Sequence, residues 1–407
     1  MAHACVVGSG IAGLASAIRL RNKGYAVKVF EANPYPGGKM HAETYAGYRF
    51  DLGPSLFTMP HLVEELFELC GEDPKQHFPF RRKDTLCHYF WEDGTRFFAP
   101  GNPEVFIGEA SRTFQEPADR LRAYLKKNRR KYELTAPLFL ERSLHRPRTY
   151  FSLKTVKALL SVGGLGIFNS LNGVNEAAFD NPKLVQLFNR YATYNGSNPY
   201  KTPGIMSMIP HLEMDLGTYY PEGGMHQIPM SLYKLARAQG VEFYFESPVK
   251  RILTENGSAV GVALADRTIP ADIVVSNMDI FPTYRNLLPG HKAPEKTLSQ
   301  ERSSSALIFY WGVRKSFPEL DLHNIFFSGD YPGEFREIFE EKRLPEDPTV
   351  YINITAKESP ADAPSGCENW FVMVNAPGDY GQDWEGMVRQ ARERILDKLS
   401  KHLLTNF

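Results

Sequence analysis

The pattern of apolar and polar positions at the start of the chain predicts a strand, a helix and a second strand. Ala4 to Val7 form a short apolar run, as expected for a buried parallel strand. In residues 11–18 apolar side chains recur with helical spacing, and Val27 to Phe30 form a second apolar run. This order indicates a β-α-β unit, and therefore an α/β fold.

The turn between the first strand and the helix has the pattern G-x-G-x-x-G, formed by Gly8, Ser9, Gly10, Ile11, Ala12 and Gly13. The first glycine makes a tight turn, the second lets the backbone approach a diphosphate, and the third allows the helix to pack closely on the strand. A diphosphate would lie at the helix N terminus, where free N–H groups favour an anion. Glu31 closes the second strand and can accept hydrogen bonds from a ribose diol. These residues predict a site for an adenine dinucleotide.

The residues after Glu31 do not continue as further β-α-β units. Residues 33–39 form a second glycine-bearing loop that could touch the same nucleotide, and alternating segments around Ala46-Gly47 predict a hairpin. A Gly-Pro loop follows at residues 53–55. An enzyme that uses a nicotinamide dinucleotide would normally add more β-α-β units here, so the pattern favours a flavin dinucleotide.

Composition excludes several classes of function. Among 407 residues, 47 Lys and Arg balance 47 Asp and Glu. The chain therefore has no net positive charge to attract a polyanion, and we expect no nucleic-acid partner. Four scattered cysteines and 11 histidines without metal-ligand spacing predict no metal site, and favour a reducing, cytoplasmic compartment. No segment resembles a secretory signal or a transmembrane span, so we expect a soluble or peripherally bound protein. The chain also lacks the G-x-S-x-G pattern of many hydrolases.

Residues 76–220 interrupt the nucleotide-binding pattern, as an inserted substrate domain would. Aromatic residues gather around the Asp93-Gly94 turn, between Phe78 and Phe98. Two interpretations remain open: two amphipathic strands that face a core, or the wall of an apolar tunnel.

Residues 120–131 carry seven Lys and Arg interleaved with Leu121, Tyr124 and Leu125, which predicts a helix with a basic and an apolar face. A further set of cations precedes the short apolar stretches at 158–162 and 166–168, and consists of Arg142, Arg146, Arg148, Lys154 and Lys157. A solvated charge run is the ordinary explanation. Cations beside short apolar segments also favour contact with the surface of an anionic membrane.

Three blocks of the chain resemble the bacterial-type phytoene desaturases, which are FAD-dependent carotenoid desaturases of the amine-oxidase superfamily. The first block is the glycine pattern with Glu31 and Gly37-Gly38-Lys39, and the second is Phe50 to Ser55. The third runs from Tyr220-Pro221-Glu222-Gly223-Gly224 to Asn277, with a hairpin turn at Asn256-Gly257 and a buried strand at 273–276. Residues 53–60 look similar to the desaturases of hydroxylated or already elongated acyclic carotenoids, which include a hydroxycarotenoid 3,4-desaturase branch. Phytoene itself is the alternative substrate.

The resemblance implies FAD as cofactor and assigns residues to it. Gly8 to Gly13, Glu31 and Ala32 would hold the ADP moiety. Gly38, Lys39 and Met40 would line the path of the cofactor, and Gly53, Pro54 and Ser55 would lie near the flavin. Val249 is similar to a residue whose backbone meets the adenine, and Asn277 would close the strand below it.

The resemblance also implies a discontinuous Rossmann-like FAD-binding domain with an inserted α+β substrate domain and membrane-contacting helices. We expect FAD-binding segments at 1–75 and 221–280, a substrate and membrane domain at 76–220, and its continuation at 281–407. The glycine- and proline-rich segment that ends these proteins is not recognised within residues 281–407.

The expected activity is the removal of two hydrogens from an acyclic carotenoid, with oxygen or a quinone as electron acceptor and the membrane surface as partner. A flavin carries such chemistry with few acid–base residues, and we assign no catalytic residue. Two alternatives to a desaturase stay open: an FAD-dependent carotenoid isomerase, and a non-catalytic protein that binds FAD or lipid.

Overall fold

The computed structural model describes residues 1–139, 143, 146 and 165–405. The chain forms two compact units, each built from segments that are distant in sequence. Unit 1 comprises Met1–Arg81, Tyr219–Glu301 and Glu358–Ser365, and unit 2 comprises Arg82–Thr218, Arg302–Lys357 and Gly366–Phe407. The short return at Glu358–Ser365 has no counterpart in the division expected from the sequence.

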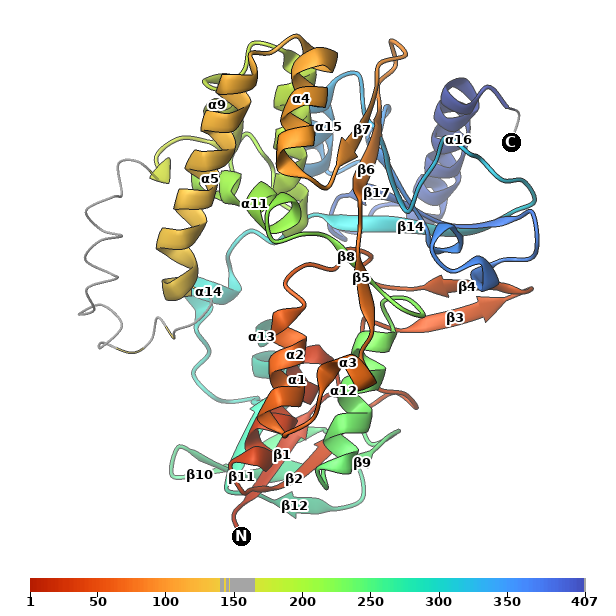
Figure 1. Cartoon of the computed structure of the whole chain (residues 1–407). Coiled ribbons are helices and arrows are strands. Elements are labelled where there is room, and N and C mark those ends of the chain that lie inside the picture. Colours follow the sequence, from red (N-terminus) through yellow and green to blue (C-terminus); the bar gives the residue numbers. More distant parts are fainter. Residues whose placement is uncertain (140–142, 144–145, 147–164, 406–407) are drawn as a thin grey trace. The chain divides into compact units, whose positions relative to one another are not determined.

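Unit 1 is organised around a four-stranded parallel sheet in the order β13-β1-β2-β9 (Figure 1). Its strands are β1 (His3–Val7), β2 (Ala26–Phe30), β9 (Glu242–Tyr244) and β13 (Ile273–Ser276). The predicted β-α-β unit is confirmed, since α1 (Ile11–Asn22) connects β1 to the parallel strand β2. Strand β13 is half-buried rather than fully buried, because it lies at the edge of the sheet.

Each face of this sheet is covered by its own hydrophobic cluster. On one face β1 and β2 pack with α1, α2 (His61–Leu69) and α12 (Gln227–Ala238). On the other they pack with the antiparallel strands β10 (Arg251–Glu255), β11 (Ser258–Ala263) and β12 (Thr268–Pro270). The sheet therefore forms the middle layer of three.

Both hairpins expected from the sequence are present in unit 1. Ala46 and Gly47 have φ angles of 50° and 83° between β3 (Ala42–Tyr45) and β4 (Tyr48–Asp51). Asn256 and Gly257 have φ angles of 51° and 79° between β10 and β11. Positive φ at both central residues matches the right-handed twist of the strands. Shorter elements complete the unit: α3 (Pro74–His77), β5 (Phe80–Arg82), β8 (Tyr219–Pro221), α13 (Ile280–Pro282), η3 (Thr283–Leu287), α14 (Glu295–Leu298) and η6 (Pro360–Asp362).

Unit 2 contains a six-stranded sheet in the order β14-β17-β16-β15-β6-β7, in which only the β15–β6 pair is parallel (Figure 1). The strands are β14 (Ser305–Val313), β17 (Glu368–Ala376), β16 (Val350–Ile354), β15 (His323–Phe326), β6 (Thr85–Phe90) and β7 (Arg96–Pro100). Helix α16 (Trp384–Leu403) packs on one face. The helices on the other face are α4 (Pro103–Phe114), α5 (Ala118–Phe139), α9 (Leu171–Glu176), α10 (Pro182–Asn189), α11 (Ile209–Met214) and α15 (Tyr331–Arg336). Single turns complete the unit: η1 (Arg190–Asn195), η2 (Gly204–Met208), η4 (Glu337–Glu341) and η5 (Thr355–Lys357).

The aromatic residues around the Asp93-Gly94 turn lie mainly in the core of unit 2. Tyr89, Trp91 and Phe97 are buried between the sheet and its helices, whereas Phe98 is exposed. Two amphipathic strands that face a core, β6 and β7, therefore describe this segment.

Residues 120–131 form part of α5, as predicted, but its apolar face is turned into the protein. Leu121, Tyr124 and Leu125 are buried in the core of unit 2, so they are not free to enter a membrane. Lys131 is also buried, and its ammonium donates to Gly204 O and Ser207 Oγ at 3.1 and 2.7 Å. Of the other predicted basic and apolar positions, Arg142, Arg148, Lys154, Lys157 and residues 158–162 lie outside the described residues. No described helix is both long and apolar enough to cross a bilayer.

Candidate functional site

The G-x-G-x-x-G turn of unit 1 is compact because backbone fills the space that side chains would need. Gly8 has a φ of +91°, which favours glycine. A Cβ atom at Gly13 would lie only 2.2 Å from the Gly8 carbonyl oxygen, so helix α1 can approach β1 only with glycine here. The second glycine loop lies alongside, since Gly37 N donates to Ser9 O at 2.9 Å. The structure thus brings the two predicted glycine loops together.

Asn277 forms one wall of this turn. Its backbone N–H donates to Val7 O at 2.9 Å, which extends the pairing of β13 with β1. A Cβ atom at Gly10 would lie 2.7 Å from Asn277 Nδ2. The resemblance assigned Asn277 to the cofactor site at the end of a strand, and the structure places its side chain against the glycine turn.

The N terminus of α1 has the character of an anion site. Gly10 is the N-cap residue, no side chain caps the helix, and the first turn contains no acidic residue. The positive end of the helix dipole and its N–H groups are therefore not matched by a side chain of the helix itself. This end of the helix fits a diphosphate group.

Glu31 is buried at the end of β2 and is already held by four hydrogen bonds. Ser9 N and Oγ donate to Oε2 at 2.7 and 2.8 Å, and Asn33 N and Nδ2 both donate to Oε1 at 2.9 Å. A carboxylate has about four acceptor positions, and these donors fill them. A ribose diol bound here would replace the side-chain donors Ser9 Oγ and Asn33 Nδ2, whereas the two backbone donors would continue to orient the carboxylate.

The remaining predicted residues lie on either side of the glycine turn. Gly53 packs so closely on Lys39 that a Cβ atom would meet the Lys39 carbonyl oxygen at 1.9 Å, and the His226 ring bonds to Met40 O. Val249 is buried among residues of β1 and β2, and Ser247 N, near it in sequence, donates to Glu31 O at 2.8 Å. Several of these positions are accessible: Ala12, Ala32, Lys39 and Pro54 are exposed, and Gly38, Met40, Gly53 and Ser55 are half-buried.

Asp51 fastens the hairpin to the third block of the resemblance. Its carboxylate accepts from Met225 N and His226 N at 3.0 and 3.1 Å, directly before α12, and pairs with Arg49 at 2.8 Å. Arg49 also pairs with Asp362 of the short return segment at 3.3 Å. Met225, His226 and Asp362 are each 174 or more residues from the side chain that they contact, so no local sequence signal could have identified these links.

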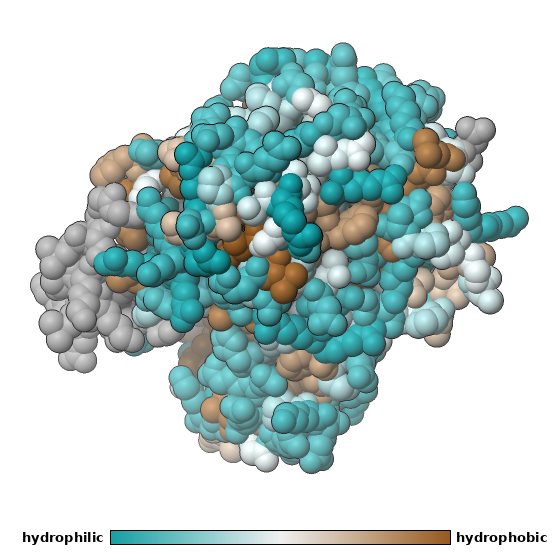
Figure 2. Space-filling view, turned by 45° about the horizontal axis from the view of Figure 1, so that its top comes forward, coloured by the Kyte–Doolittle hydropathy of each residue, from teal (hydrophilic) through white to brown (hydrophobic). Residues whose placement is uncertain are grey.

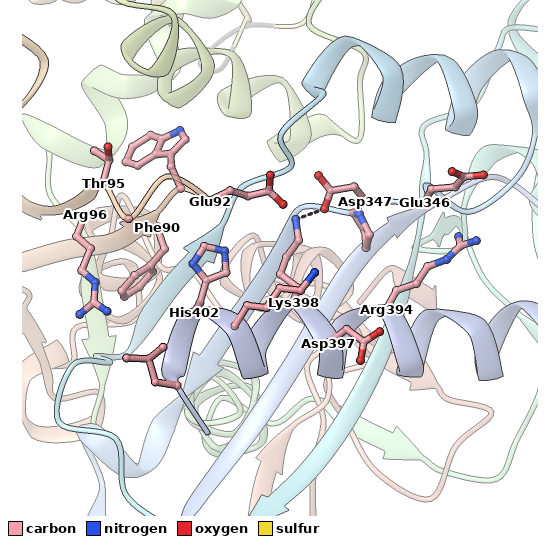
Figure 3. Close-up of a pocket in the computed structure, with 15 residues that line it drawn as sticks. Phe90, Glu92, Thr95, Arg96, Glu346, Asp347, Arg394, Asp397, Lys398 and His402 are labelled. Carbon is pink, nitrogen blue, oxygen red and sulfur yellow. Dashed lines mark ion pairs between the residues drawn. The ribbon is translucent and has the colours of Figure 1, made fainter. Parts of the chain in front are cut away.

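Unit 2 has a cavity of about 650 Å³ between the β6–β7 turn and α16 (Figure 3). Glu92, Asp347, Arg394 and Lys398 are among its lining residues, and Lys398 pairs with Asp347 at 2.5 Å. A lining of opposite charges that pair with one another is unsuited to a hydrocarbon ligand. Among the described residues, no three or more metal-ligating side chains come together.

Comparison with known proteins places these features in context. The model of the family described as flavin containing amine oxidoreductase matches residues 11–405. A 1-hydroxycarotenoid 3,4-desaturase from Flavobacterium sp. (strain P99-3) is 60% identical over 403 residues, which cover 99% of this chain and 82% of that protein. A 4,4'-diapolycopene oxygenase from Methylomonas sp. is 32% identical, with 98% of this chain and 81% of that protein covered.

Solved structures with a similar fold include an oxidoreductase from Methanosarcina mazei, with a TM-score of 0.64 at 16% identity. That match covers 98% of this chain and 84% of the other. A variant of putrescine oxidase has a TM-score of 0.63 at 15% identity, with 99% and 81% covered. At such low identity these structures support the α/β fold alone.

Proposed function

Because the chain belongs to the family of flavin-containing amine oxidoreductases, we propose that it is an FAD-dependent desaturase acting on an acyclic carotenoid. The observation that carries this proposal is the 60% identity to a 1-hydroxycarotenoid 3,4-desaturase over nearly the whole chain. The same relative favours a hydroxylated carotenoid over phytoene as substrate. Oxygen or a quinone would accept the electrons.

The chain's own residues would hold FAD in unit 1. Gly8, Gly10 and the N terminus of α1 would bind the diphosphate, and Glu31 would bind the ribose in place of its present side-chain donors. Lys39, Met40 and Gly53 would continue the site toward the flavin. When bound, FAD supplies the two-electron chemistry that takes hydride from carbon. The protein's part is to orient the substrate and exclude water, which requires no catalytic triad. Unit 2 would be the substrate domain.

Product analysis tests this proposal. Protein reconstituted with FAD is incubated anaerobically with acyclic carotenoids in liposomes while the flavin absorbance is recorded. Bleaching of the flavin together with a product that has lost two hydrogens supports desaturation. A product of unchanged mass would indicate an isomerase, whereas incorporation of oxygen after air is admitted would indicate the activity named for the Methylomonas relative. Bound flavin with no product of any kind would contradict an enzymatic role.

The exposed face of α5 supports contact with an anionic membrane surface. Lys126, Lys127 and Arg130 are exposed on α5. Gly166 lies close to Lys131 of the same helix, and Phe168, two residues after Gly166, is 84% exposed. On the face drawn in Figure 2, hydrophobic residues form separate small areas among hydrophilic ones. Attachment through α5 would rely on its exposed cations together with Phe168.

The membrane contact can be tested by sedimentation with anionic vesicles. We expect the triple variant Lys126→Gln, Lys127→Gln and Arg130→Gln to bind the vesicles more weakly at low salt, because each exposed cation near such a surface contributes about 1 kcal/mol to binding. Arg122→Gln is the matched control, since Arg122 on the same helix already pairs with Glu104 and Asp119. Equal binding by the triple variant and the wild type would remove α5 from the membrane contact.

A further inference from the structure

Unit 2 buries a charged pair that the proposed chemistry does not use. Arg190, in η1, donates through Nη2 to both carboxylate oxygens of Glu213, in α11, at 3.1 and 3.0 Å. Arg190 Nε also donates to the hydroxyl of Tyr89, in β6, at 2.8 Å. Because both charges are almost completely buried, the pair depends on this geometry. It fixes the position of the guanidinium between the sheet and its helices.

The guanidinium in turn fixes the neighbouring Tyr191. The Arg190 Cζ atom lies 4.4 Å from the centre of the Tyr191 ring, a cation–π contact. Tyr191 is 0% exposed, and its hydroxyl has no hydrogen-bond partner within the described part of the chain. Buried hydroxyls normally have a partner, so an oriented phenol with none among the described residues is available to bind a ligand.

Tyr194 connects this buried group to an accessible surface. It lies one turn after Tyr191, its ring centre is 5.7 Å from Arg190 Cζ, and it remains 37% exposed. The rings of Tyr191 and Tyr194 are 5.5 Å apart. The ring of Tyr191 is therefore in contact with a ring that reaches the surface.

The surroundings select a neutral, hydroxyl-bearing hydrocarbon. Burial raises the pKa of the Tyr191 hydroxyl well above its ordinary value, so it remains a neutral O–H donor. Glu213 would repel an anionic ligand, and Arg190, although paired, would repel a cation. Phe188 and the tyrosine rings offer apolar contact on both sides.

We propose that the Tyr191 hydroxyl, oriented by the Arg190–Glu213 pair, binds the hydroxyl group of a hydroxylated carotenoid and so determines the preference for it. The inference rests on the proposed function and deepens it. Tyr191 is a specificity-determining residue in this arrangement, and Arg190 and Glu213 are positioning residues.

The variant Tyr191→Phe tests the proposal, because it removes only the unpartnered oxygen and keeps the ring over Arg190. The full chain, reconstituted with FAD, is assayed with a 1-hydroxylated acyclic carotenoid and with the matching hydrocarbon that lacks the hydroxyl. We expect kcat/KM for the hydroxylated substrate to fall roughly tenfold or more, with little change for the hydrocarbon. The thermal midpoint should not fall, because the variant removes no hydrogen bond to a described residue.

Tyr331→Phe is the matched control, since Tyr331 is a buried tyrosine of the same core. It should leave the ratio of the two kcat/KM values unchanged. An unchanged ratio in Tyr191→Phe, or equal loss with both substrates, would overturn the proposal while wild-type activity still supported the desaturase. A wild type that desaturates neither substrate would instead overturn the proposed function. Equilibrium quenching of tryptophan fluorescence by each carotenoid gives a second readout that is independent of turnover.

Discussion

The glycine turn of unit 1 and the Arg190–Glu213 cluster of unit 2 are shaped in opposite ways. In unit 1 the absence of side chains on the glycines creates the form of the site, because the Gly8 carbonyl oxygen blocks a Cβ atom at Gly13 and the Asn277 amide blocks one at Gly10. In unit 2 large side chains shape the cluster, through the Arg190–Glu213 ion pair, the hydrogen bond to the Tyr89 hydroxyl and the contact of Arg190 with the Tyr191 ring. The glycine turn should therefore be sensitive to added side-chain volume, whereas the charged cluster should be sensitive to the loss of one member of its ion pair.

The largest expected effect follows from removing one partner of the buried pair. Glu213→Ala leaves the Arg190 guanidinium buried without its counter-charge, which should cost about 3–5 kcal/mol in the free energy of unfolding. Denaturation in urea at neutral pH measures this loss. The double variant with Arg190→Met should recover much of the stability, because it leaves no isolated charge.

An exposed pair provides the control for that experiment. Arg129 and Glu133 lie 2.9 Å apart on α5 with more than half of each side chain exposed. Glu133→Ala should therefore cost no more than about 0.5 kcal/mol. Similar losses in Glu133→Ala and Glu213→Ala would show that burial does not distinguish the two pairs.

Adding one methyl group should break the glycine turn. In Gly13→Ala the new Cβ would meet the Gly8 carbonyl oxygen at 2.2 Å, and overpacking of this kind costs about 1–3 kcal/mol. Separation of α1 from β1 should also abolish retention of FAD, measured as flavin absorbance after gel filtration. Gly108→Ala is the matched helical control, because nothing lies within 4 Å of its Cβ position, and it should keep FAD.

The two regions also differ in how far sequence could predict them. The glycine pattern, Glu31 and both hairpins could be recognised from short segments, where φ angles and spacing decide the structure, although Asn277 reaches the glycine turn from a distant strand. Arg190 and Tyr89 are 101 residues apart, so their bond depends on packing of an η1 turn over β6. Lys131 illustrates the same limit, since it follows six other cations in sequence yet lies inside because Gly204 and Ser207 supply acceptors. Local patterns predict turns and strands, while burial of a polar group depends on distant partners.

The last effect concerns protonation of the unit 2 core at acid pH. Burial lowers the pKa of His323 from 6.5 to about 3, and its Nδ1 bonds to Tyr351 at 2.8 Å. The unfolded chain therefore binds a proton at this residue between about pH 6.5 and 3 that the folded chain does not, so stability falls as the pH falls through this range. By pH 5 the loss from this residue should reach about 2 kcal/mol. His323→Gln should flatten the decline in unfolding free energy between pH 7 and pH 5, and His77→Gln, at an exposed histidine of unit 1, should leave it unchanged. An equally steep decline in His323→Gln would assign the acid sensitivity to other groups. A flatter decline would show that the core of unit 2 is destabilised by adding a proton to a buried side chain, just as it is by removing one partner of a buried pair.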